Sequence, residues 1–169
     1  MKRISFNLSI DSIQNAIKEV EKYQEELNQK VELLVQKLAE SGLEVAKAVV
    51  GTHTHGTGET LASLRIELDT EGNLKRATLI GQSEALLFLE FGAGIHFNQD
   101  MTHPMASELG YGVGTYPGQI HSFDENGWYY LGDDGKWHHS YGIKADMPMY
   151  KSAQAMRNKI LSIAKSVFQ

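Results

Sequence analysis

The sequence predicts an α+β fold in one domain. The expected elements are a long N-terminal helix, a small antiparallel sheet, a short helix, a Gly- and aromatic-rich loop insertion with a hairpin, and a C-terminal helix. Apolar residues recur at helical 3–4 spacing through the first forty residues, alternate with polar ones over 64–68, and return to helical spacing after 148. A length of 169 residues favours a single domain, and 41% hydrophobic side chains suffice for a core.

The first forty residues have the pattern of one long helix. Three polar residues are candidate N-caps: Ser9, Asp11 and Ser12. An apolar seam follows: Ile13, Ile17, Val20, Leu27, Val31, Leu34 and Leu38, with Gln24 in the place of one member. A narrow seam suits packing along one partner, in the same domain, which we favour, or in another subunit. Ser41-Gly42 is expected to end or kink this helix, and 43–50 to form a second, short one.

The next part predicts a two-stranded sheet followed by a helix. A polar, His-bearing loop at 53–58 precedes the alternating run at 64–68, which is typical of a half-buried strand. Residues 70–73 form a turn signal, and 74–80 are expected to return as the second strand. The apolar run 85–91 follows Ser and Glu, which favours a short helix over a buried strand.

Residues 92–143 hold ten of the sixteen glycines and show little periodicity, which indicates an ordered functional loop or an insertion. Within them, 128–131 and 136–139 flank a Gly-Asp-Asp-Gly turn, a hairpin signal. Pro148 is expected to open the last helix. Its apolar face is predicted from five residues: Ala153, Met156, Ile160, Ile163 and Val167.

Charge and composition exclude several classes. A net charge of −5 argues against a general nucleic-acid binder, and the lack of cysteine excludes disulfides and thiolate-bound metals. No apolar run approaches the length of a membrane span, and charges interrupt any export signal, so synthesis in a cytoplasm is expected. Residues 92–143 carry one basic and six acidic side chains, whereas 144–169 carry five basic and one acidic.

Seven histidines raise the question of a metal site. His53 and His55 form an H-x-H pair, and the other five lie in the loop region: His96, His103, His121, His138 and His139. Five carboxylates are nearby in sequence: Asp100, Glu108, Asp124, Asp133 and Asp134. No pair has the spacing of a metalloprotease helix, so polar loop residues are the favoured interpretation, and a His-metal hydrolase is a remote alternative. Without a nucleophile elbow or phosphate loop, we expect no enzyme, and neither catalytic residues nor a cofactor or metal site.

The segment 127–137 resembles one unit of the aromatic cell-wall-binding repeats that hold choline between Trp and Tyr rings. Such modules stack several copies, and this chain has one. An aromatic-anchored hairpin packed on its own domain or on a neighbour is therefore favoured. A cell-wall or carbohydrate-binding module acting through Trp128, Tyr129, Tyr130 and Trp137 is the rival function.

Three blocks carry a wider resemblance: Gly58 to Ile66, Ala85 to Gly94, and Met147 to Ala153. In order and spacing they are similar to the tail-component (neck, head–tail joining or tail-completion) morphogenesis family of tailed bacteriophages and prophages. Glu90-Phe91-Gly92 matches the family pattern, whereas Ala93 replaces its usual Thr. A His-rich loop stands where a Pro-Val-Asp segment is common, and the 95–143 insertion exceeds the minimal pattern.

The resemblance implies a non-catalytic virion subunit, made in the bacterial host cytoplasm, that assembles as a ring at the head–tail junction. Its partners would be copies of itself and other connector and tail proteins, with no membrane and no sequence-specific nucleic acid. The single domain 1–169 would comprise a helical arm (1–50), a sheet and short helix (58–94), the insertion (95–143) and the C-terminal helix (144–169).

Candidate interface residues follow from these blocks, the aromatic hairpin and the basic helix. They are Gly58, Leu61, Ser63, Glu90, Phe91, Gly92, Gly94, Trp128, Tyr129, Trp137, Pro148 and Arg157. Gly92 and Gly94 would permit close backbone approach. Glu90 would either pair with a basic group across an interface or serve as a cap or salt bridge within the subunit.

Overall fold

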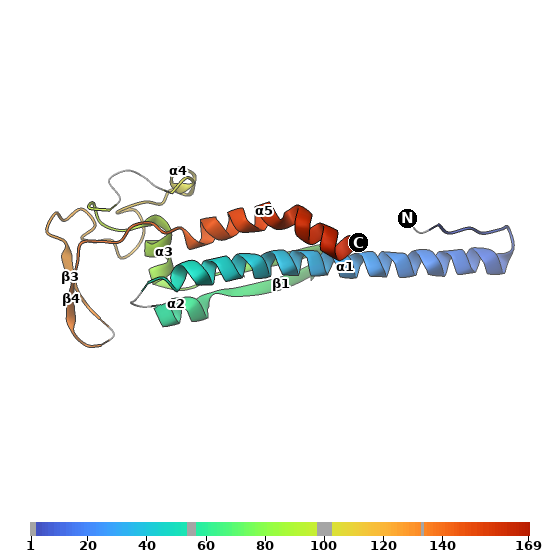
Figure 1. Ribbon diagram of the computed structural model, residues 1–169, viewed down its shortest axis with the longest axis horizontal. Helices are drawn as coiled ribbons and strands as arrows, with labels where there is room; N and C mark the ends of the chain where they lie inside the picture. Colours follow the sequence, from blue (N-terminus) through green and yellow to red (C-terminus); the bar gives the residue numbers. More distant parts are fainter. Residues whose placement is uncertain (1–2, 54–56, 98–102, 133) are drawn as a thin grey trace.

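The computed structural model describes residues 3–53, 57–97, 103–132 and 134–169, and it has the α+β architecture expected (Figure 1). The elements in chain order are α1 (Ile10–Val50), α2 (Thr57–Ser63), β1 (Arg65–Glu71), β2 (Leu74–Ile80), α3 (Glu84–Phe91), α4 (Ala106–Leu109), β3 (Trp128–Leu131), β4 (Trp137–Ser140) and α5 (Pro148–Phe168). The molecule is elongated, because α5 and the β1–β2 hairpin lie along one half of α1 while the other half projects (Figure 1).

Helix α1 is a single element of 41 residues. Of the three candidate N-caps, Ser9 takes this role, and its Oγ accepts a hydrogen bond from the Ser12 N–H at 3.3 Å. The expectation that Ser41-Gly42 ends or kinks the helix is wrong. Gly42 faces α5, where an added Cβ would lie 2.8 Å from the Met156 Sδ, so the glycine permits close helix packing. Packing outweighs the roughly 1 kcal/mol helix-propensity cost of glycine.

Helix α5 runs antiparallel to α1 and starts at Pro148, as predicted (Figure 1). Gly42 meets Met156 near the middle of the contact, and the Lys30 ammonium lies 5.9 Å from the centre of the Phe168 ring at its far end. The predicted apolar face is partly wrong, since Ala153 is exposed and Ile160 is 46% exposed. Ser152 is buried instead, and it can be because its hydroxyl donates to the Pro148 carbonyl at 2.6 Å.

The β1–β2 hairpin confirms both predicted strands. Its antiparallel register runs from Arg65 opposite Ile80 to Glu71 opposite Leu74. Burial falls along it: Leu64, just before β1, is 3% exposed, whereas Leu68 is 50% exposed. The alternating pattern therefore marks a strand that is covered only at its base.

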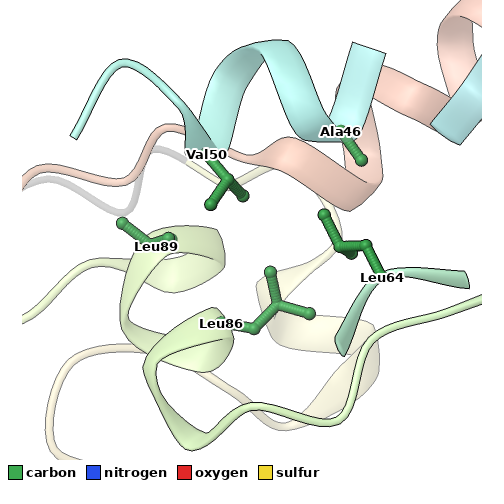
Figure 2. Close-up of a cluster of buried hydrophobic side chains, with 5 residues drawn as sticks. All are labelled: Ala46, Val50, Leu64, Leu86 and Leu89. Atoms are coloured by element: carbon green, nitrogen blue, oxygen red, sulfur yellow. The ribbon is translucent and has the colours of Figure 1, made fainter. Parts of the chain in front are cut away.

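The main core lies where α1, the base of the hairpin and α3 converge (Figure 2). Its buried members are Ala46, Val50, Leu64, Leu86 and Leu89. The short helix expected after Ser83 is confirmed as α3, and it supplies two of these side chains. A second cluster joins Phe91 of α3 to Ala106 and Tyr116 of the insertion. The core is small, and it sits at one end of the α1–α5 pair.

The insertion leaves and rejoins the scaffold at one point. Ala93 and Ile143 form an isolated antiparallel bridge with hydrogen bonds of 2.9 and 2.8 Å in the two directions. The predicted hairpin is confirmed as β3–β4, with Trp128 opposite Ser140 and Leu131 opposite Trp137. It projects from the end of the molecule that lies opposite the free end of α1 (Figure 1).

Candidate functional site

The carboxylate of Glu90 is the central polar group of the scaffold. Glu90 is 6% exposed at the end of α3, and its two oxygens accept hydrogen bonds from the backbone of α5: Oε2 from the Met149 N–H at 2.7 Å and Oε1 from the Tyr150 N–H at 2.9 Å. Of the two alternatives for Glu90, the structure thus shows the intrachain cap. The carboxylate satisfies the first free donors of α5 and sits at the positive end of the helix dipole.

Helix α5 needs this distant cap because its own N-cap supplies none. Met147 occupies that position with a left-handed backbone, φ 54°, and no side-chain cap bond. Pro148 has no N–H, and the Lys151 N–H bonds the Met147 carbonyl at 2.9 Å. The free N–H groups that remain are those of Met149 and Tyr150, and both donate hydrogen bonds to Glu90.

His103, from the insertion, completes the Glu90 site. It is 5% exposed, and its Nε2 lies 2.9 Å from the Glu90 Oε1. The Met105 N–H donates to the His103 Nδ1 at 3.1 Å, so Nδ1 is the acceptor and Nε2 carries the proton that bonds Glu90. The ring also packs against Phe91 and Tyr150, at centroid distances of 4.5 and 5.3 Å. This buried cluster ties insertion, α3 and α5 together.

The glycines that follow Glu90 serve contacts within the chain. The Gly92 carbonyl accepts from the Tyr116 hydroxyl and from the Gln119 amide, the latter at 3.0 Å. Burial raises the pKa of Tyr116 well above its usual range. Gly94 has φ +79°, and a Cβ there would lie 2.7 Å from the Tyr141 carbonyl oxygen. Gly94 thus permits the close backbone approach of the segment that leaves the insertion at Tyr141 and Gly142.

The aromatic hairpin presents exposed rings on one face. Tyr129 and Trp137 are 68% and 70% exposed. The other face of the hairpin borders an open cleft of about 1230 Å³, whose far wall comes from α2 and α3 through Thr60, Ser83 and Phe88. His138 hydrogen-bonds Asp134 at 2.9 Å, and this contact, ahead of the Lys136 N–H, lowers the pKa of the Asp134 carboxyl.

The histidines do not converge in the described part of the chain, where no group of three or more His, Asp or Glu side chains is placed to hold a metal ion. His53 pairs with Asp146 at 2.8 Å, although the contact lacks hydrogen-bond alignment. His55, Asp100 and Asp133 lie outside the described residues, as does half of the loop predicted at 53–58. The loop prediction is wrong at its end, because Thr57 and Gly58 belong to α2.

The candidate interface residues fall into two groups. One set is buried around the Glu90 site: Glu90, Phe91, Gly92, Gly94 and Pro148. The others are exposed or partly exposed and lie on different elements: Gly58, Leu61, Ser63, Trp128, Tyr129, Trp137 and Arg157. Leu61 packs against the main core. From the sequence, His103 is named only among the histidines, where a polar loop residue is the favoured interpretation, but it is buried against Glu90. Tyr116 is not among the candidates, since it lies in an irregular stretch with no periodicity.

Charge separates on the surface as the sequence indicates. The five basic residues after 143 are all exposed: Lys144, Lys151, Arg157, Lys159 and Lys165. Among the described acidic residues of the insertion, Glu108, Asp124, Glu125 and Asp134 are exposed. The chain thus presents a basic helix and an acidic insertion.

Comparison with known proteins finds no matching family model, no matching curated protein and no matching solved structure. In the described ranges, none of the helices combines the length and apolar character needed to cross a membrane.

Proposed function

We propose that this protein is a structural subunit of a tailed phage or prophage particle, a tail or neck component that assembles with copies of itself as a ring at the head–tail junction. The supporting observation is that the three blocks of the family resemblance pack into one unit. Block 58–66 contributes Leu61 and Leu64 to the core, and block 85–94 contributes Leu86 and Leu89. Glu90 then joins the second block to the third through the Met149 and Tyr150 N–H groups.

The charge distribution supports assembly with other copies. A basic α5 on one subunit and an acidic insertion on the next would make a heterologous, head-to-tail contact, and such contacts close into rings when the rotation permits. The core is small for the length of the chain, and several large apolar residues remain exposed. Both features suit a subunit that completes its burial in an assembly.

Particle composition tests this role. Particles purified after induction of the strain carrying the gene should contain the protein by mass spectrometry. Deletion of the gene should leave heads and tails unjoined in electron micrographs, and expression from a plasmid should restore joined particles. Absence of the protein from purified particles, or normal joined particles after deletion, would contradict the proposal.

A second candidate function, glycan or choline binding, is favoured by the exposed rings of Tyr129 and Trp137 on one face of the hairpin. On the other face, Trp128 and Tyr130 line the wide cleft. Aromatic faces of this kind hold cations and sugar rings. The only two tryptophans of the chain lie on this hairpin, so their fluorescence reports on it directly. Titration with choline or cell-wall fragments should quench the emission, and Trp137→Ala should remove most of the change. An unchanged spectrum at saturating ligand would reject this candidate.

A further inference from the structure

The first half of α1, residues 10–29, extends past the rest of the scaffold; we call it the free half (Figure 1). Helix α5 and the β1–β2 hairpin pack against α1 only from residue 30 onward. There the Lys30 ammonium lies over the Phe168 ring at the end of α5, and Glu32 pairs with Lys75 of β2 at 3.1 Å. At 1.5 Å per residue, the free half is about 30 Å long.

The apolar seam continues into the free half with a regular seven-residue repeat. Written as a heptad abcdefg, position a holds Ile10, Ile17 and Gln24, and position d holds Ile13, Val20 and Leu27. The five apolar members are exposed by 74% (Ile10), 38% (Ile13), 51% (Ile17), 53% (Val20) and 39% (Leu27). The next members, Val31, Leu34 and Leu38, continue the repeat and are half-buried within the chain. The chain therefore covers one half of its seam and leaves the other half uncovered.

The described residues before α1, 3–9, do not cover the seam. The segment 3–9 turns back beside the free half, and the Asn7 N–H bonds the Ser12 hydroxyl at 2.9 Å (Figure 1). The exposed fractions of the seam residues hold with this segment in place. Phe6 and Leu8 are themselves 62% and 92% exposed, which adds apolar surface next to the seam.

We propose that the free halves of several copies of this chain associate as a parallel, in-register coiled coil. A repeat of seven residues keeps an a/d seam facing its partners through a left-handed supercoil. β-Branched residues at both positions, Ile17 at a with Ile13 and Val20 at d, favour three or more strands over two. A bundle of that order is compatible with a cyclic assembly whose symmetry axis runs along it.

Gln24 selects the parallel register. In parallel strands it meets the same residue of a neighbouring copy, and the two amides can donate to and accept from each other. In antiparallel strands overlapped along the free half, Gln24 lies opposite Ile13, where its amide would be desolvated without a partner. A polar residue at one a position is a known device for fixing register at some cost in stability.

The flanking positions are compatible with this arrangement. Parallel strands bring position g of one copy next to position e of another. In the free half these positions hold Ala16 and Tyr23 at g, and Gln14, Glu21 and Asn28 at e. Glu21 is the one charged residue among them, so association brings no like charges together across the interface. The inference goes beyond the proposed virion role and does not depend on it.

Disulfide trapping in the full chain tests the register. The chain has no cysteine, so Gln24→Cys introduces a single thiol. Parallel register places these thiols within bonding reach, and mild oxidation should give a disulfide-linked species. The matched control is Lys22→Cys at the outward f position, which should stay unlinked. Equal linking of both variants would overturn the proposal, and so would linking only in a mixture of Gln24→Cys with Ile13→Cys.

Sedimentation of the full chain tests the association itself. The wild type should associate below about 0.1 mM, and Ile17→Glu should raise the concentration of half-association roughly tenfold or more. The control Gln29→Glu, at an f position, should behave as the wild type. Circular dichroism checks that both variants keep their helix content. A wild type that stays monomeric, or an Ile17→Glu variant that associates equally well, would overturn the proposal. Detection of the protein in particles is a separate result and is not affected by either outcome.

Discussion

At the scale of single residues, the molecule depends on a carboxylate that caps a helix from another part of the chain. Glu90 lies 59 residues before Met149, the nearer of the two residues whose backbone N–H groups donate to its carboxylate. A buried carboxylate is costly unless donors surround it, and three donors do so here: two N–H groups of α5 and the His103 ring. Glu90 thereby fixes where α5 begins, and it holds the insertion against the scaffold through His103.

Glu90→Gln should destabilise the protein by about 1–3 kcal/mol. The amide keeps one acceptor oxygen, but it loses the negative charge that the α5 N-terminus favours, and its NH₂ group faces donors. Urea unfolding followed by circular dichroism measures the change. Glu44→Gln, on the exposed face of α1, is the matched control and should change stability by less than about 0.5 kcal/mol. Equal effects of the two substitutions would contradict the capping role.

The sequence identified Glu90 but not its partners. Its place in a conspicuous apolar block singled it out, and both a cap and a salt bridge were foreseen as intrachain roles. Which backbone groups it accepts depends on how α3 meets α5, which no local pattern encodes. His103 stands out in the sequence only as one of seven histidines, and nothing local pairs it with Glu90, because it lies in a stretch without periodicity and reaches Glu90 through the tertiary fold.

At the scale of elements, the sequence predicts those features that depend on interactions between residues close together in the chain. The sequence predicts the Pro at the start of α5 and the two hairpins, and it places Ser9 among three candidate caps, since each of these features depends on neighbouring residues. Two predictions failed where packing decides. Gly42 continues its helix because α5 fills the space beside it, and the buried stripe of α5 includes Ser152 rather than Ile160.

The burial gradient along the β1–β2 hairpin makes a paired prediction. Leu64→Ala should cost about 2–5 kcal/mol, because it leaves a cavity in the main core. Leu68→Ala, two side chains further along the same face, should cost less than about 1 kcal/mol, since that leucine is 50% exposed. Chemical denaturation of both variants gives the comparison. Similar losses at the two positions would contradict this prediction and would mean that another copy of the chain covers the outer hairpin in solution. In that case the free energy of unfolding would also depend on protein concentration.

At the scale of the whole molecule, the fold places its two exposed apolar surfaces far apart. The free half of α1 projects at one end and the aromatic hairpin at the other, while the core and the Glu90 site lie between them (Figure 1). A rod with different surfaces at its two ends and a basic helix along its side can contact several neighbours at once. This geometry suits an assembly subunit.

The head-to-tail contact of the proposed ring predicts a charge dependence. Arg157→Glu should weaken association between copies, because it reverses a charge on the basic face of α5. Light scattering at low and high salt measures the effect, and added salt should weaken the wild type as well. Lys37→Glu, an exposed reversal on α1, should leave association unchanged. Equal losses from both reversals would assign the effect to net charge.

The Ala93–Ile143 bridge has a consequence for how this chain can vary. Its two hydrogen bonds hold the two ends of the insertion side by side, so the insertion starts and finishes at the same place on the scaffold. We expect this place to accept insertions of different length without movement of the helices, because closing a longer loop costs only slightly more conformational entropy. Three contacts restrict the exchange: a replacement would have to return a donor to Glu90, a donor to the Gly92 carbonyl and apolar side chains against Phe91. We expect that segments which keep these contacts can replace the insertion, so that one scaffold would carry different exposed surfaces.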